Sequence, residues 1–556
     1  MLIVLLALMG CATEEPTYDL ILRGGTVYDG SGFPPRMVDV AIAGDRIVAI
    51  GDLDAASGAR EIDVSGLAVA PGFINMLSWA TESLFIDGRG LSDIVQGVTL
   101  EVMGEGWSLG PLNESMRAEA LSRQDRATYD LPWTTLGEAL EHLESQGVSP
   151  NIASFVGATT VRIHELGYDN RAPTPDELAR MRELVRTAME EGAMGVGSSL
   201  IYAPAAFADT AELTALSAVA GEYGGMYISH LRSEGDRLLE ALDELITIAR
   251  DANVAAEVYH LKAAGQGNWH KLDEVVERIE AARAEGLAIT TDMYLYTAGA
   301  TGLNATMPPW VQEGGHDSWV ARLRDPAIRA RVIDEMRRPG EDWENFNVAV
   351  ASADDILLAG FRNEDLTHLI GKTVGEVAAE RGVSPEEAII DLVIEDDSRV
   401  DTVFFLMSEE NVERQIALPY MSFGSDGETL APEGVFLDYN PHPRAYGNVA
   451  RLLGHYVRDR GVIPLEEAIR RLTAWPASNL KLRDRGRLQT GFFADVVVFD
   501  PATIQDHATF EEPHQLATGV VHVFVNGEQV LRDGEHTGAT PGRVVRGPGW
   551  VGWSTE

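Results

Sequence analysis

Cysteine is almost absent from this sequence, because Cys11 is the single one among 556 residues. A lone cysteine excludes a disulfide within the chain and a zinc site built from several thiolates. Basic residues are also few, with 44 Lys and Arg against 86 Asp and Glu, and the formal net charge is −42. Such a charge argues against nucleic acid or an anionic membrane surface as a partner.

Long apolar runs and a phosphate-binding loop are missing as well. The apolar start MLIVLLALMGC is too short to span a membrane. It resembles the export signal of a bacterial lipoprotein, so we expect residues 1–17 to be signal and tether, with lipid attached at Cys11. The protein would then be exported, periplasmic or on the cell surface, with that lipid as its membrane contact. No phosphate-binding loop occurs.

Two kinds of pattern divide the rest of the chain. Apolar and polar residues alternate in 18–70 and again in 475–556, broken by Gly and Asp, which predicts short antiparallel strands. We expect these two ends to combine into one β-sandwich. Strand and helix patterns follow one another in 71–474, which predicts an α/β fold, a TIM-like (β/α)8 barrel. An irregular stretch at 304–352 is predicted to form a lid over the barrel mouth.

The barrel prediction depends most on two similar segments, MYISHLRSEG and AEVYHLKAAG, which are separated by a helical pattern. Each reads as a strand that ends in a histidine, His230 or His260, and continues into a polar turn. The carboxyl ends of parallel strands form the active-site face of such barrels. Two imidazoles on adjacent strand ends would therefore converge at the mouth, as a divalent metal requires.

Several phrases in a fixed order carry a family resemblance. PGFIN, the paired histidines, FGSDG, FADVVVFDP and VNGEQV together resemble the amidohydrolase superfamily. DMYLYTAGATGL, HPRAYG and TGATPGRVVRG look like its N-acyl-D-amino-acid deacylase branch, and the resemblance covers nearly the whole chain after Tyr18. It implies a metal-dependent hydrolase acting on a carbon–nitrogen bond other than a peptide bond, with a small N-acyl amino acid as substrate.

The sequence departs from this resemblance where most superfamily members carry a His-x-His pair of metal ligands. Leu77 and Trp79 occupy those places, and neither binds zinc. A two-metal centre is therefore not expected. Glu105 stands where members of the branch often carry a cysteine ligand, and a carboxylate is an accepted zinc ligand.

The resemblance then implies a site with one zinc ion per chain, held by Glu105, His230 and His260. Zinc lowers the pKa of a bound water, so that hydroxide forms near neutral pH and attacks the polarised amide carbonyl. Asp426, at the tip of the strand that ends in FGSDG, is the predicted proton carrier between this water and the leaving amine.

The carboxylate of an N-acyl amino acid also needs partners in the site. Lys262 and Arg444 could supply positive charge, and Tyr202 and Tyr296 could supply hydroxyl groups. All four could equally be structural, as solvated cations or core aromatic rings. Arg232 and Glu234, just after His230, are predicted to pair with each other.

Two other functions stay open from the residues alone. One is hydrolysis of a different amide, such as a dipeptide or a cyclic imide, on the same metal. The other is a catalytically silent binding lipoprotein, which the loss of His-x-His would allow. The acyl chain, the amino-acid side chain and the oligomeric state are not determined by the sequence, and the preference for D substrates comes from the resemblance alone.

Overall fold

A computed structural model of the protein describes residues 17–124 and 128–552. Cys11 lies outside the described residues. No helix in the described part of the chain combines the length and the apolar character that crossing a membrane requires.

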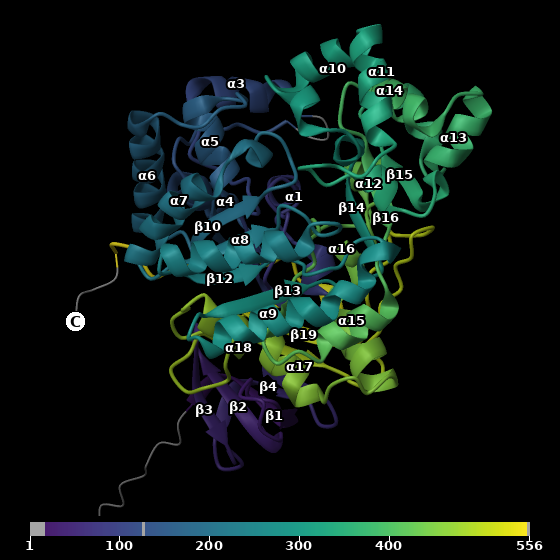
Figure 1. Cartoon of the computed structure of the whole chain (residues 1–556). Coiled ribbons are helices and arrows are strands. Elements are labelled where there is room, and N and C mark those ends of the chain that lie inside the picture. Colours follow the sequence, from purple (N-terminus) through teal and green to yellow (C-terminus); the bar gives the residue numbers. More distant parts are fainter. Residues whose placement is uncertain (1–16, 125–127, 553–556) are drawn as a thin grey trace, which may run out of the picture.

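Parallel strands form a barrel at the centre of the molecule (Figure 1). They are β6 (Phe73–Asn75), β7 (Val98–Met103), β8 (Asn151–Ser154), β9 (Val156–Gly157), β10 (Gly195–Ser199), β11 (Met226–His230), β12 (Ala255–Val258), β13 (Ile289–Met293) and β17 (Met421–Phe423). β8 and β9 are one strand interrupted at Phe155, whose N–H donates to the carbonyl of Met103 at 2.8 Å. Met76 N–H donates to the carbonyl of Phe423 at 3.2 Å, which joins the first strand to the last and closes the barrel. The predicted TIM-like α/β fold is confirmed.

Amphipathic helices cover the outside of the barrel and bury their apolar faces against its strands. Those that follow its strands include α2 (Leu91–Ile94), α4 (Leu136–Gln146), α5 (Ala158–Leu166), α6 (Pro175–Glu190), α7 (Thr210–Glu222), α8 (Leu238–Asp251), α9 (Leu272–Ala284), α16 (Arg444–Arg451), α17 (Leu465–Leu472) and α18 (Ala474–Asn479). α6 shows how the sequence sets their limits. Thr174 caps its first turn reciprocally with Glu177, Pro175 fits the first helical position, and Gly192 follows its end with φ 99°.

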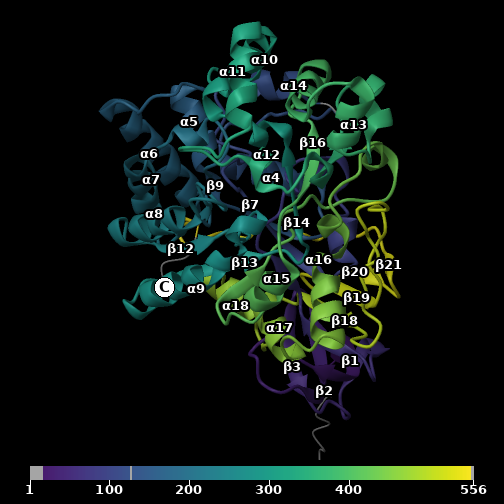
Figure 2. The ribbon, with the colours of Figure 1, turned by 45° about the vertical axis from the view of Figure 1, so that its right-hand side comes forward.

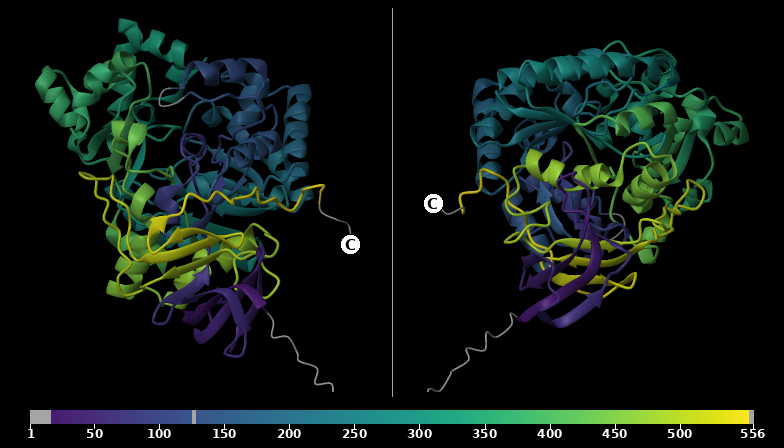
Figure 3. Two further views of the ribbon diagram at one scale, coloured as in Figure 1. Left: turned by 180° about the vertical axis from the view of Figure 1, so that it is seen from behind. Right: turned by 90° about the horizontal axis from the view of Figure 1, so that it is seen from below.

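The two ends of the chain combine, as predicted, and their strands belong to one hydrogen-bonded sheet. The strands are β1 (Thr17–Val27), β2 (Arg36–Ala43), β3 (Arg46–Gly51), β4 (Ser57–Asp63), β5 (Ala68–Pro71), β18 (Val496–Phe499), β19 (Val520–Val525), β20 (Glu528–Arg532) and β21 (Glu535–His536). The two halves meet where β18 pairs antiparallel with β5, with Val497 opposite Ala70. Figures 2 and 3 show the purple first strands beside the yellow last strands, below the barrel.

The segment TGATPGRVVRG, predicted as a strand, is an exception. It runs beside β8 and makes only isolated bridges, from Pro541 to Val148 and from Val544 to Ile152. Proline has no N–H to donate, so a continuous ladder cannot pass through Pro541.

A compact insertion stands beside the barrel mouth and contains the predicted lid, 304–352. It is longer than predicted, because its antiparallel sheet joins β14 (Ala298–Gly302), β16 (Asp401–Phe405) and β15 (Ile356–Gly360). Its helices are α10 (His316–Arg324), α11 (Pro326–Met336), α12 (Phe346–Ala349), α13 (Val374–Arg381) and α14 (Pro385–Asp396), which enclose an apolar core of their own (Figure 1). The pairing of strands about a hundred residues apart is not visible in a local sequence pattern, and this explains the difference.

Three further helices complete the α-helices of the described residues: α1 (Ser83–Ile86), α3 (Glu114–Ser122) and α15 (Glu409–Ile416).

Candidate metal centre

Three potential ligands meet at the carboxyl ends of the barrel strands. Glu105 follows β7, His230 ends β11 and His260 follows β12, and one donor atom from each lies within 4.8 Å of the others. Oε1 of Glu105 lies 3.1 Å from Nδ1 of His230 and 3.0 Å from Nε2 of His260. All three side chains are buried. The structure therefore brings together the donor set that the sequence predicted.

Unusual backbone conformations set the direction of these side chains. Glu105 is flanked by Gly104 and Gly106, whose φ angles are 109° and 71°. A Cβ atom at Gly104 would lie 2.4 Å from the carbonyl oxygen of Phe155, so only glycine fits there. His260 has φ 32° and Asp426 has φ 50°, both in the left-handed region. Strained backbone of this kind is concentrated at functional sites. It points the side chains of His260 and Asp426 in a direction that an ordinary extended backbone would not give.

A second carboxylate, Glu234, lies behind the two imidazoles. Its Oε1 is 3.0 Å from Nδ1 of His260, and its Oε2 is 3.5 Å from Nε2 of His230. Each imidazole thus turns one nitrogen toward Glu105 and the other toward Glu234. A carboxylate behind a ligating histidine fixes its tautomer and its orientation. The sequence-based pairing of Glu234 with Arg232 was wrong, because Arg232 bonds Glu244 at 2.8 Å and Glu234 bonds Lys262 at 2.7 Å.

The electrostatics of this cluster favour a cation. Burial and the Lys262 charge oppose protonation of His260, yet the carboxylates of Glu234, Glu105 and Asp426 raise its pKa to about 10. Burial likewise opposes ionisation of Glu105, but the two imidazoles hold the pKa of that carboxyl well below its usual range. Two imidazoles and a carboxylate form a common catalytic zinc set. The residues present therefore fit a divalent ion. Its positive charge would compensate the negative charge of the carboxylates around His260.

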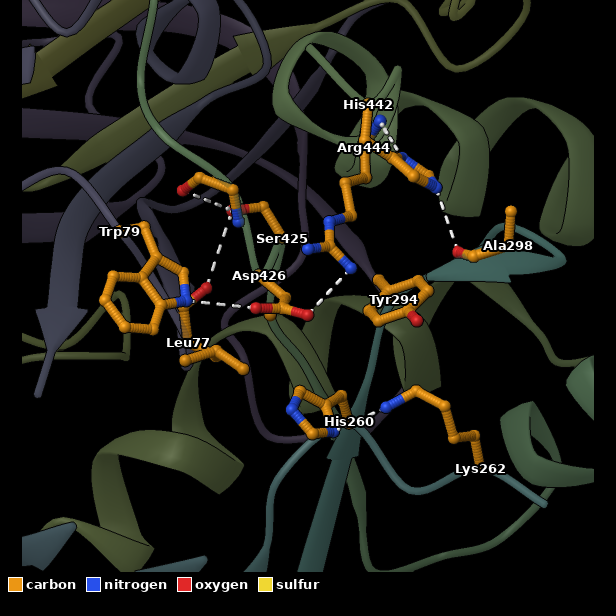
Figure 4. A network of polar contacts seen from close by, with 12 residues as sticks. Leu77, Trp79, His260, Lys262, Tyr294, Ala298, Ser425, Asp426, His442 and Arg444 are labelled. Carbon is orange, nitrogen blue, oxygen red and sulfur yellow. Dashed lines mark hydrogen bonds and ion pairs between the residues drawn. The ribbon is translucent and has the colours of Figure 1, made fainter. Parts of the chain in front are cut away.

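Asp426 follows β17 and faces the same point (Figure 4). Its Oδ2 pairs with Nη1 of Arg444 at 2.7 Å, and its Oδ1 accepts a hydrogen bond from Nε1 of Trp79 at 3.1 Å. Burial raises the pKa of the Asp426 carboxyl despite the positive charge of Arg444. A buried carboxylate with a raised pKa takes up a proton more readily than an exposed one, as a proton carrier must.

A pocket of about 680 Å³ opens above these residues, between the barrel and the insertion. Three of the four predicted substrate-binding residues, Tyr202, Lys262 and Arg444, line this pocket. Lys262 is already engaged, however, because its Nζ bonds Glu234 at 2.7 Å and lies 2.8 Å from Nδ1 of His260.

Tyr296 is placed differently from the prediction. It is absent from the pocket lining, and its hydroxyl donates to Oδ2 of Asp506 at 3.4 Å. The Arg451 guanidinium lies 4.8 Å from the centroid of the Tyr296 ring and holds this ring near Asp506. Tyr294 lines the pocket in its place, with the Arg444 guanidinium 4.4 Å from its ring centroid.

Two residues of the site were missed from the sequence, for different reasons. Glu234 lies four residues after His230, and a carboxylate close after a ligand is a usable signal. The sequence showed that Trp79 cannot bind zinc, but it gave no indication that its indole N–H would join the site. Leu77 is fully buried in an apolar cluster with Ile74 and Met76, so it offers nothing to a metal.

Comparisons with known proteins agree with this geometry. The model of the Amidohydrolase family matches residues 60–531. D-aminoacylase of Alcaligenes xylosoxydans xylosoxydans is 35% identical over 535 residues, which cover 96% of this chain and 98% of that protein. A structure of D-aminoacylase that concerns its binuclear metal center has a TM-score of 0.79 at 34% identity, covering 95% of this chain and 100% of that one.

N-acyl-D-glutamate deacylase from Bordetella bronchiseptica, complexed with zinc and a phosphonate inhibitor that mimics the tetrahedral intermediate, has a TM-score of 0.79 at 30% identity. The match covers 96% of this chain and 100% of that one.

Proposed function

The chain belongs to the amidohydrolase family, and on that premise we propose that it hydrolyses the amide bond of N-acyl-D-amino acids, releasing a carboxylic acid and a D-amino acid. The observation that carries the proposal is the convergence of Glu105, His230, His260 and Asp426 at the floor of one pocket. The choice of N-acyl-D-amino acids is supported by the relatives, which are named as deacylases of such compounds.

Glu105, His230 and His260 would hold the ion, and zinc suits their donor types. Bound there, zinc would supply a Lewis acid for the amide carbonyl and lower the pKa of a water molecule. Oε1 of Glu234 and Nζ of Lys262 both lie beside Nδ1 of His260, so the ring presents Nε2 to Glu105 as the nitrogen that would ligate. Oε1 of Glu105 points toward both imidazoles, so this oxygen is the one that would ligate the ion.

Asp426 would move the proton. Its carboxylate accepts a proton from the attacking water and delivers it to the nitrogen of the leaving amine, so the amide bond breaks without a free amide anion. Trp79 and Arg444 hold one oxygen each, which fixes the plane of the carboxylate (Figure 4). Its burial excludes bulk water from the proton path.

Arg444 is the side chain best placed to bind the substrate carboxylate. It is 4% exposed, lines the pocket, and its Nε has no hydrogen-bond partner among the described residues. A buried guanidinium N–H is costly to leave unpaired, so its vacant donor favours an anionic group of the substrate. Tyr294, whose ring packs on the guanidinium, keeps it facing the cavity.

A substrate panel run with elemental analysis tests the function. We expect about one zinc per chain and hydrolysis of N-acetyl-D-amino acids, with much slower hydrolysis of their L forms and of dipeptides. Preferred hydrolysis of dipeptides or cyclic imides would move the enzyme to another substrate class. A protein without bound transition metal and without turnover would overturn the proposal.

A further inference from the structure

Trp79 joins two carboxylates that belong to different parts of the site. Its Nε1 lies 3.0 Å from Oε2 of Glu105. The same atom lies 3.1 Å from Oδ1 of Asp426 (Figure 4). An indole has a single N–H and no acceptor, so both carboxylates share one proton donor. Trp79 is half-buried at the pocket floor, where water competes poorly for this donor.

The division of oxygen atoms shows what this contact does. Glu105 turns Oε1 to the imidazoles and Oε2 to Trp79, while Asp426 turns Oδ1 to Trp79 and Oδ2 to Arg444. Two negative groups that face each other repel unless something positive lies between them. Here the positive end of the indole N–H dipole occupies that place. The contact therefore fixes the proton carrier relative to a residue of the metal position.

The same place offers no support for a further cation. Leu77, the other residue at this strand end, is fully buried among apolar side chains and has no ligand atom. Of the three carboxylates here, Glu234 is paired with Lys262 and Asp426 with Arg444, which leaves the charge of Glu105. One divalent ion would more than neutralise the remaining charge, and a second would place two more positive charges in a buried site without new ligands.

We propose that Trp79 is a positioning residue that takes the place of a second metal ion, making this a centre for one cation only. Its N–H holds Asp426 against Glu105, and its ring together with Leu77 closes the second cation position. The inference rests on the proposed function, because Asp426 needs this placement only if it carries the proton. It departs from the relative described as having a binuclear metal center.

The zinc content of the protein tests whether Trp79 and Leu77 exclude a second metal ion, and this test needs no activity measurement. The wild-type protein is dialysed against excess zinc, then against buffer, and its zinc content is measured. We expect one zinc per chain. In the double variant Leu77→His and Trp79→His, two imidazoles stand two residues apart just after β6, and we expect two zinc ions per chain. Two zinc ions in the wild-type protein, or still one in the double variant, would overturn this part.

Kinetics of Trp79→Phe test the positioning role. Phenylalanine keeps an aromatic ring and removes the N–H, so we expect one zinc per chain, an unchanged KM and a fall in kcat of about 10- to 100-fold. Retained zinc shows that the metal position is intact. The matched control is Trp310→Phe. Nε1 of Trp310 donates a hydrogen bond of 2.8 Å to the carboxylate of Glu335, and neither residue lines the pocket. Loss of this bond should leave kcat unchanged.

The failure of this inference is distinct from that of the proposed function. A wild-type protein without zinc and without hydrolysis would remove the function itself. A wild-type protein that binds one zinc and hydrolyses the substrate, with Trp79→Phe equally active, would leave the function standing and overturn the role of Trp79.

Discussion

Oε1 of Glu234 lies 3.0 Å from Nδ1 of His260, on the side of the ring that faces away from Glu105. His260 is therefore held from both sides by carboxylates, and only one of them reaches the metal position. Because the nitrogen toward Glu234 carries the proton when the other ligates, this contact selects the binding tautomer.

Glu234→Gln should weaken zinc binding without abolishing it. The amide keeps an oxygen acceptor but loses the negative charge behind both imidazoles, and the apparent zinc affinity should fall about 10- to 100-fold. Competition with a chelator measures the change. Glu244→Gln is the control, because Glu244 bonds Arg232 outside the metal position and should leave the affinity unchanged. Equal affinities for both variants would contradict this role of Glu234.

His260→Asn and Asp426→Asn should separate metal binding from turnover. Loss of an imidazole ligand removes zinc and activity together, and the same holds for His230→Asn. Asp426→Asn keeps zinc, because Asp426 is not a ligand, but kcat falls by about 10²- to 10⁴-fold for lack of a proton acceptor. Zinc content and kcat measured on the same preparations check both outcomes. Full turnover in Asp426→Asn would remove this residue from the mechanism.

Arg444→Lys should act through the carboxylate of the substrate. Lysine keeps the charge but loses the planar donor pair, so KM for an N-acyl-D-amino acid should rise about tenfold. The corresponding N-acyl-D-amino-acid amide lacks the carboxylate and serves as the matched control. Its kcat/KM should change much less between the two proteins. An equal loss for both substrates would assign Arg444 only to its ion pair with Asp426.

Ionisation of the buried Glu344 carboxyl should lower the stability of the protein as pH rises. Burial raises the pKa of this carboxyl from 4.5 to about 7, against the opposing hydrogen bond from Ser233. The folded protein then binds more protons than the unfolded chain, so this contribution to stability is complete below about pH 4.5 and is lost as pH approaches 7. The loss is at most about 3 kcal/mol.

Glu344→Gln should remove most of this dependence. Thermal unfolding at about pH 5 and about pH 8 measures it, and the decrease in Tm between them should be smaller in the variant than in the wild-type protein. Glu341→Gln changes an exposed neighbour and should behave like the wild-type protein. An identical decrease in all three proteins would show that Glu344 ionises normally.

The sequence predicted most of the metal position because each ligand has a local signal. His230 and His260 each end an apolar strand pattern before a polar turn, and parallel barrel strands bring such ends together. The same logic found Asp426, whereas Glu105 was identified through the family resemblance. Period-two alternation at both chain ends likewise predicted strands there, and with them the association of the two ends.

The remaining parts depend on contacts that no local pattern shows. Tyr294 and Tyr296 look alike in sequence, and only the placement of Arg451 and Asp506 turns one of them away from the pocket. Glu234 has two cations within reach, Arg232 and Lys262, and the fold decides between them. The sheet of the insertion pairs strands that are far apart in the chain, so its limits were placed too narrowly.

The pairing of β5 with β18 also determines the order in which the chain can fold during synthesis. Ala70 meets Val497, so one edge of β5 stays without its partner until nearly the whole polypeptide has left the ribosome. An open edge of this kind can pair with other chains. A nascent chain of this enzyme should therefore depend on a chaperone until its last strands emerge, and truncation at the C-terminus should cause aggregation rather than a smaller folded enzyme.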